Sequence, residues 1–171
     1  MNERNVKIKK LVILSLLIAM EVILSRFLSI SAWNIKLGFA FVPLAVAAML
    51  HGPLAGGIVG ASADLIGAIL FPSGAFFPGF TATAFLRGVV LGLCLYKGQS
   101  AHRIAMAVGI NQVIFSLIIN TLWISILYGS PYVPLLGTRV LQSILMIVVQ
   151  FVVISAMAKL MKPVFTKMQK L

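Results

Sequence analysis

Three ionisable side chains lie inside long apolar stretches of the sequence: Glu21, Asp64 and Arg87. Arg26 and Arg139 stand close to the edges of such stretches. Placing an ionised side chain in an apolar environment is costly unless it is paired or binds another polar group. These residues are therefore suited either to a buried ion pair, such as Asp64 with Arg87, or to the binding of a charged ligand.

A further set of polar and small residues recurs within the apolar stretch 104–127. Their spacings of three and four place them on one face of a helix. The set is Gly109, Gln112, Ser116, Asn120 and Trp123. The amide and hydroxyl groups are suited either to line a pocket or to join helices by hydrogen bonds, and Trp123 is also suited to anchor a helix at a membrane interface.

The elements that carry these residues are long apolar segments. The chain has 171 residues, of which 61% are hydrophobic and only 10% charged, and its mean hydropathy is +1.10. Such a composition predicts an all-α membrane protein, a compact bundle of six transmembrane helices in which residues 1–171 form a single domain. The predicted spans lie near residues 11–30, 37–51, 53–71, 77–96, 104–127 and 139–161.

The positions of the basic residues give the bundle an orientation. The amino-terminal segment, the 97–103 loop and the carboxyl-terminal segment hold ten of the fourteen Lys and Arg residues. By the positive-inside rule both termini are expected to be cytoplasmic, in a multi-pass protein of the cell membrane. The net charge of +11 therefore indicates contact with the lipid bilayer, and no solvated basic domain is present that would bind nucleic acid.

This orientation brings several polar side chains into the outer half of the predicted bundle. They are Arg26, Asp64, Arg87, Asn120, Trp123, Arg139 and Gln142. We expect them to form a polar pocket that opens to the outside. Phe76 and Phe77 of the neighbouring loop are suited either to stack on a flat ring or to contact lipid, and the role of Glu21 stays open.

The residues that several other classes of protein need for their function are missing from this sequence. There is no G-x-x-x-x-G-K-[ST] phosphate loop, so we expect ATP hydrolysis, where it is needed, to take place in other subunits. The sequence contains no pair of a nucleophile and a histidine within an apolar stretch, and no cluster of metal-binding residues. Nothing in it therefore indicates a catalytic site or a metal site. A stand-alone secondary transporter that uses Asp64 or Glu21 as a proton site is the alternative from another class.

Two regions of the chain resemble a known family. The first contains residues 35–43, the Gly-Pro-Leu-Ala-Gly-Gly run at 52–57 and Ala63-Asp64; the second is 71–81, continuing to Leu86-Arg87-Gly88. In these residues the chain resembles the substrate-binding S components of energy-coupling factor (ECF) transporters, and the second region is most similar to the folate-specific branch.

The resemblance implies a function and partners. S components of the prokaryotic plasma membrane capture a vitamin at the outer side. They deliver it inward together with a transmembrane T component and two ATP-binding cassette ATPases, and need no cofactor of their own. Family members contact the T component through an Ala-x-x-x-Ala pattern in the first span. The matching positions here are Ser15 and Ala19, so the first position departs from the pattern while staying small.

Folate as the transported ligand agrees with the residue types in the expected pocket. Cationic side chains are suited to its two carboxylates, Asp64 and Asn120 to the donor edge of its pterin ring, and aromatic rings to stacking. Riboflavin, pantothenate and a queuosine precursor stay open as other vitamins. The expected substrate-binding residues are Arg26, Lys36, Asp64, Phe77, Arg87, Asn120, Trp123, Arg139 and Gln142.

Overall fold

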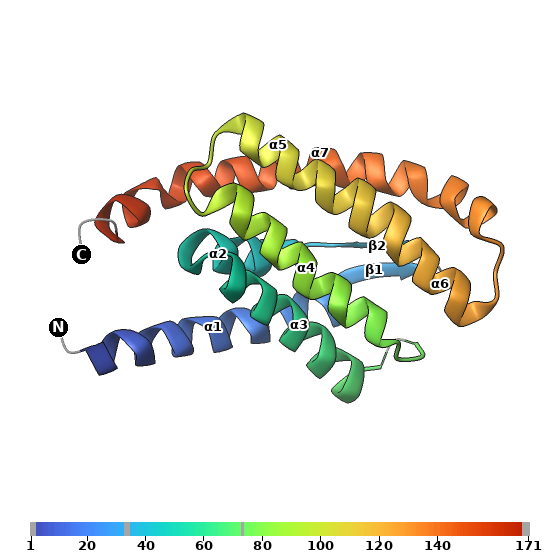
Figure 1. Ribbon diagram of the computed structural model, residues 1–171, viewed down its shortest axis with the longest axis horizontal. Helices are drawn as coiled ribbons and strands as arrows, with labels where there is room; N and C mark the ends of the chain where they lie inside the picture. Colours follow the sequence, from blue (N-terminus) through green and yellow to red (C-terminus); the bar gives the residue numbers. More distant parts are fainter. Residues whose placement is uncertain (1–2, 33–34, 73, 169–171) are drawn as a thin grey trace.

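The protein is folded mainly into helices, of which the first and the last lie along the longest axis of the molecule and several others run obliquely to it (Figure 1). The computed structural model describes residues 3–32, 35–72 and 74–168, and the side chains of residues 4–29, 37–72 and 74–161. The helices are α1 (Glu3–Arg26), α2 (Phe41–His51), α3 (Pro53–Leu70), α4 (Pro78–Leu95), α5 (Ala101–Gly109), the π-helix η1 (Ile110–Ile119), α6 (Asn120–Tyr128) and α7 (Tyr132–Met168). Because α5, η1 and α6 follow one another without a break, they form one continuous rod.

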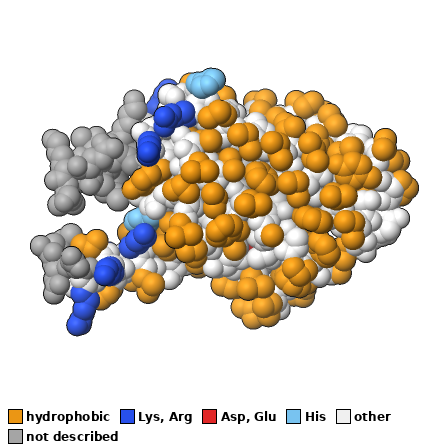
Figure 2. Space-filling view, in the orientation of Figure 1, with side chains coloured by type: hydrophobic (Ala, Val, Ile, Leu, Met, Phe, Trp, Pro, Cys, Tyr) orange, Lys and Arg blue, Asp and Glu red, His pale blue; other side chains and the backbone are white. Residues whose placement is uncertain are grey.

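Four of the described helical segments are long and apolar enough to cross a membrane. They are Pro53–Leu70, Pro78–Leu95, Ala101–Tyr128 and Tyr132–Met161. α1 has 24 residues, which span about 36 Å, but it carries several charged side chains, and α2 has only 11 residues. Large apolar side chains cover much of the visible surface (Figure 2), as is required of helices that face lipid. The molecule is therefore a helical membrane protein.

A β-hairpin joins α1 to α2, so the expectation of an all-α chain is wrong at this segment. The predicted first span, 11–30, ends too late, because α1 ends at Arg26. Strands β1 (Ser29–Ala32) and β2 (Ile35–Gly38) then pair antiparallel, with Ser29 opposite Gly38. The predicted second span, 37–51, begins too early for the same reason. Hydropathy does not distinguish these strands from helix ends, because it records the polarity of side chains and not the pairing of backbone groups.

The last two predicted spans also differ from the structure in their bounds. The rod predicted at 104–127 runs from 101 to 128 and contains the π-helix, which the sequence analysis did not anticipate. Gly129, with φ of 63°, adopts the left-handed conformation that ends α6. α7 begins at Tyr132 rather than at residue 139. Pro134 lies in its first turn, where a backbone N–H would have no partner within the helix, so its absence costs no hydrogen bond.

Helices α3 and α4 pack backbone to backbone. A Cβ atom built at Gly88 of α4 would overlap the carbonyl oxygen of Gly56, and one at Gly60 of α3 would lie 2.6 Å from the carbonyl oxygen of Ala84. The four-residue spacing of Gly56 and Gly60 places small residues on one face of α3, which allows this close approach. This pair of helices holds Asp64 and Arg87 at a fixed mutual position.

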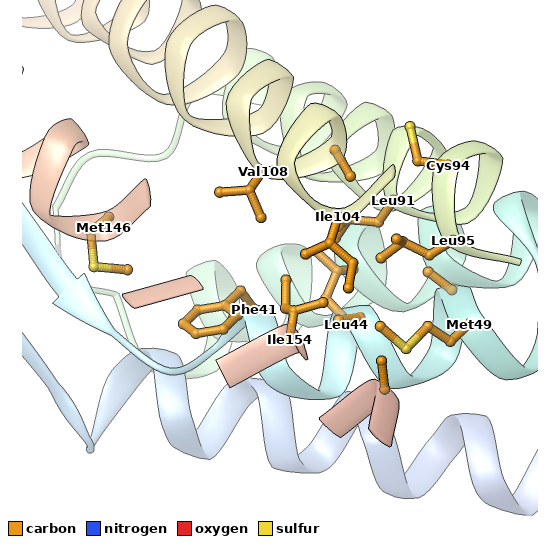
Figure 3. Packing of buried hydrophobic residues seen from close by; sticks show 14 residues of the cluster. Phe41, Leu44, Met49, Leu91, Cys94, Leu95, Ile104, Val108, Met146 and Ile154 are labelled. Atoms are coloured by element: carbon orange, nitrogen blue, oxygen red, sulfur yellow. The ribbon is translucent and has the colours of Figure 1, made fainter. Parts of the chain in front are cut away.

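A cluster of buried apolar side chains fills the space between α2, α4, α5 and α7 (Figure 3). Leu44, Ile104 and Ile154 are among its members. Phe41, Leu44 and Met146 belong to this cluster and also line the polar cavity described below. The apolar core therefore closes that cavity from within the molecule.

The start of α1 and the end of α7 lie at the same end of the molecule (Figure 1). Lys and Arg side chains gather at this end, and no acidic side chain is visible on the face shown (Figure 2). Lys7, Lys9 and Lys10 of α1 are exposed there, as is Lys97 between α4 and α5. The hairpin, the α3–α4 loop and the α6–α7 loop lie in the half of the molecule away from this end (Figure 1).

Candidate ligand-binding cavity

A cavity of about 390 Å³ lies near the end that holds the hairpin and the α3–α4 and α6–α7 loops. Its lining comes from the last turns of α1, the hairpin, the start of α2, the second half of α3, the first half of α4, and from η1, α6 and α7. Residues 74–77 of the α3–α4 loop complete the wall. Segments that are far apart in the sequence thus meet around one polar space.

Most of the expected binding residues meet in this cavity. Those that line it are Arg26, Asp64, Phe77, Arg87, Asn120, Arg139 and Gln142. Trp123 is not part of the lining. It packs on Phe77 with ring centroids 5.3 Å apart, and its indole N–H donates to Thr83 Oγ1 at 2.9 Å. The side chain of Lys36 lies outside the described residues.

Arginine side chains dominate the charge of the lining. Arg139 is only 5% exposed, and its Nε and Nη1 atoms have no hydrogen-bond partner among the described residues. The Nε atom of Arg87 also lacks one there. Arg26 crosses α3 at Gly67, where a Cβ atom would lie 2.5 Å from its Nε. Buried guanidinium N–H groups without acceptors favour a ligand that supplies anionic oxygens.

Asp64 is held by a neighbouring hydroxyl. The Oγ1 atom of Thr81 donates to Asp64 Oδ2 at 2.7 Å, which leaves the other carboxylate oxygen for a different donor. Asp64 and Arg87 interact electrostatically, but no ion pair joins them in the described part of the chain. A closed Asp64–Arg87 pair that only fixes helix register is therefore not what the structure contains.

The polar stripe on the central rod faces the cavity through the π-helix. Gln112, Ser116 and Asn120 line the space, and Asn120 Oδ1 has no partner among the described residues. Hydrogen bonds from i to i+5 widen each turn of a π-helix, so that side chains four residues apart stay closer to one face than in an α-helix. Trp123 follows beyond the π-helix and leaves this face.

Some lining residues were not selected from the sequence. Ser25, Tyr128 and Gln150 are polar residues of the lining that no motif or spacing singled out. Glu21, an ionisable residue within an apolar stretch for which the sequence indicates no role, also lines the cavity. The cost of burying its charge was the signal that pointed to it.

One wall of the cavity is aromatic. Phe76, Phe77 and Phe80 all contribute to the lining, and the Phe77 and Phe80 rings lie 6.1 Å apart in an edge-to-face arrangement. Phe77 stands between the cavity and Trp123, which supports it from behind. Such a wall stabilises a flat ring by stacking, so the cavity is suited to a ligand that is both planar and anionic.

Known proteins are similar to this chain in sequence and in fold. A family model described as "ECF transporter, substrate-specific component" matches residues 9–158. The folate transporter FolT of Clostridium novyi (strain NT) is 40% identical over 149 residues, which are 86% of this chain and 87% of the relative. The folate transporter FolT of Leuconostoc mesenteroides subsp. mesenteroides is 30% identical over 149 residues, 83% and 80% of the two chains.

A solved structure extends the likeness to three dimensions. A crystal structure of FolT bound with folic acid superposes with a TM-score of 0.84 at 30% sequence identity, covering 88% of this chain and 93% of that chain. The family model spans most of the sequence. The resemblance seen in the sequence is thereby confirmed, and the chain belongs to the substrate-specific components of ECF transporters.

Proposed function

We propose that this protein is a folate-binding S component, which captures folate in the cavity and delivers it across the membrane. Two relatives are folate transporters, and the similar solved structure is bound with folic acid. The observation that carries the proposal is the cavity of about 390 Å³ itself, which combines an aromatic wall with arginine N–H groups that lack acceptors.

Each part of folate finds a matching group in this cavity. The glutamate carboxylates accept hydrogen bonds from Arg26 and Arg139, with Gln142 beside them on α7 and Arg87 deeper in the bundle. The pterin ring stacks on Phe77, which Trp123 supports. Lys36, which stands on the hairpin near the outer end, adds a further cation for the carboxylates.

The donor edge of the pterin belongs to the other side of the cavity. Asp64 accepts hydrogen bonds from this edge through the carboxylate oxygen that Thr81 leaves open. Asn120, whose Oδ1 atom has no partner among the described residues, completes it. Ring and tail are thus recognised by groups of opposite charge, which accounts for a site with both carboxylates and arginines.

The proposed topology has six transmembrane helices and both termini in the cytoplasm of a prokaryotic cell. The gathering of Lys and Arg at the end where α1 begins and α7 ends supports this orientation. The cavity then opens toward the outer face of the cell membrane. α1 and α2 complete the six spans, and α2 crosses only together with the hairpin that precedes it.

Partner subunits supply the energy for transport in this proposal. The sequence contains no phosphate loop, so a T component and two ATP-binding cassette ATPases hydrolyse ATP for this chain. Ser15 and Ala19 support contact with the T component, because both are exposed on α1 and stand one helical turn apart. Small side chains there allow a partner helix to approach closely.

Ligand binding to the purified protein tests the proposed function directly. Titration calorimetry with folate, thiamine, riboflavin and pantothenate is expected to give sub-micromolar affinity for folate alone. A protein that binds another of these vitamins more tightly than folate would be an S component of different specificity. Uptake by the isolated chain, driven by a proton gradient without ATPases, would instead favour a secondary transporter.

The substitution Asp64→Asn is expected to weaken folate binding by about 10-fold to 100-fold, because it removes a charge-assisted hydrogen bond. The same titration measures the effect. Ser116→Ala serves as a control on the opposite wall, with an expected loss of less than about 10-fold for one neutral hydrogen bond. An unchanged affinity in Asp64→Asn would contradict its assignment to the pterin edge.

The substitution Ala19→Leu is expected to reduce co-purification with the T component while leaving folate affinity unchanged. The added side chain keeps the partner helix from approaching α1. Ile13→Phe adds bulk to an exposed position on a different face of the same helix and is expected to keep the complex intact. Equal recovery of the complex with both variants would exclude this contact.

A further inference from the structure

Glu21 is a carboxyl group in the cavity lining for which the proposed recognition of folate gives no role. Its side chain is 8% exposed, and it faces the cavity from α1. The Oε2 atom has no hydrogen-bond partner among the described residues. A buried acceptor without a donor is unfavourable in an apolar environment, so a ligand that brings an N–H group to this atom removes the cost.

No side chain in the described part of the protein donates a hydrogen bond to Oε2 of Glu21. Arg87 and Asp64 are the charged groups that interact with it electrostatically. Within the described part of the chain, however, neither forms a hydrogen bond or an ion pair with it, and the Nε atom of Arg87 lacks a partner as well. Glu21 and Arg87 thus present an acceptor and a donor to the same cavity without closing on each other.

The acceptors near Asp64 are too few for the donor edge of a pterin. One oxygen of Asp64 already accepts the hydroxyl of Thr81, at 2.7 Å. A 2-amino-4-oxopyrimidine ring carries a ring N–H and both hydrogens of its exocyclic amino group along one edge, and each of these favours an acceptor when buried. The open oxygen of Asp64 and Asn120 Oδ1 together accept two of these three hydrogens. The third hydrogen favours one more acceptor beside Asp64.

Glu21 stands at the right depth for the ring rather than the tail. It precedes Arg26 by five residues on α1, which places it about 7.5 Å further from the outer end of this helix. Arg26 is the last residue of α1 and lies against Gly67 of α3, whereas Glu21 interacts electrostatically with Arg87 and Asp64. The outer cation is thus available for carboxylates, and the deeper acid for a buried ring.

We propose that Glu21 accepts a hydrogen bond from the exocyclic amino group of the bound ring, beside Asp64. It thereby selects 2-aminopyrimidinone rings over rings of the same shape without this amino group. The inference rests on the proposed function, because the ring in question is the pterin of folate. It adds a specificity-determining residue that neither the family motifs nor the helical spacing indicates.

A double comparison of protein and ligand tests the role. Folate and an analogue with a methyl group in place of the 2-amino group are titrated into the wild-type protein and into Glu21→Gln. The dissociation constant of the analogue divided by that of folate is expected to fall by about 10-fold in Glu21→Gln. This is the effect of losing one charge-assisted hydrogen bond to the amino group. In Arg139→Ala, which acts on the tail, the same ratio is expected to stay unchanged although both affinities fall.

The outcomes separate specificity from a structural role. An unchanged ratio in Glu21→Gln overturns the proposal. Equal losses of affinity for both ligands also leave the ratio unchanged, and this is the result expected if Glu21 only offsets the charge of Arg87. If Glu21→Gln does not fold, Glu21→Asp is tested in its place. Its shorter carboxylate is expected to lower the ratio, and an unchanged ratio overturns the proposal. Failure of the wild-type protein to bind folate overturns the proposed function instead.

Discussion

Replacing Arg139 with alanine is expected to lower the affinity for folate by about 30-fold or more, since losing one partner of a buried charged pair costs about 2 to 5 kcal/mol. Arg139 is 5% exposed and carries two nitrogen atoms, Nε and Nη1, without partners among the described residues. In the proposed complex, oxygen atoms of the tail carboxylates accept hydrogen bonds from these N–H groups. Titration calorimetry of the purified protein measures the change.

The choice of ligand shows which part of folate Arg139 binds. A pterin without the aminobenzoyl-glutamate tail is expected to bind Arg139→Ala and the wild-type protein equally well. Lys97→Ala, at the opposite end of the molecule, is expected to leave the affinity for folate unchanged. Equal losses for folate and for the pterin alone would contradict the assignment of Arg139 to the tail.

Adding a single methyl group at Gly88 is expected to destabilise the fold by about 3 kcal/mol, the upper part of the usual range for overpacking. The Cβ atom of Gly88→Ala would overlap backbone atoms of Gly56 and approach the backbone nitrogen of Gly57 within 2.7 Å. Backbone atoms cannot rotate away as a side chain does, so α3 and α4 must separate. The apparent melting temperature of the ligand-free protein is expected to fall by roughly 6 to 12 °C.

Gly109 provides a matched control for this substitution. It also lies within a helix, but a Cβ atom built there meets no atom within 4 Å. Gly109→Ala is therefore expected to leave the melting temperature unchanged or to raise it, because alanine favours helix by about 1 kcal/mol over glycine. Similar melting temperatures for Gly88→Ala and Gly109→Ala would show that the contact between α3 and α4 contributes little to stability.

The sequence was sufficient to predict the candidate site because burial of charge is costly wherever it occurs. Arg87, Arg139 and Asp64 stand out against apolar neighbours, and the orientation of the spans places them at similar depths. Neither step requires exact helix bounds. Errors of several residues at the ends of the first and last spans therefore did not move these side chains out of the cavity.

Other features depend on interactions that hydropathy does not record. The hairpin at 29–38 has the composition of a helix end, and only the pairing of its strands distinguishes it. The π-helix needs one more residue in each hydrogen-bonded ring, a property that no residue type announces. Trp123 carries the expected spacing, yet its indole N–H is directed to Thr83, so it supports the aromatic wall from outside the cavity.

The glycine contact between α3 and α4 also has a mechanical consequence. Two helices whose backbones touch through Gly56 and Gly88, with no flexible side chain between them, cannot slide past each other by repacking rotamers. We expect them to move as one rigid body that carries Asp64 and Arg87 together. The flexibility needed for folate to enter and leave is then expected in other walls, such as the hairpin, the α3–α4 loop and α7, which is the least buried of the four long apolar helices.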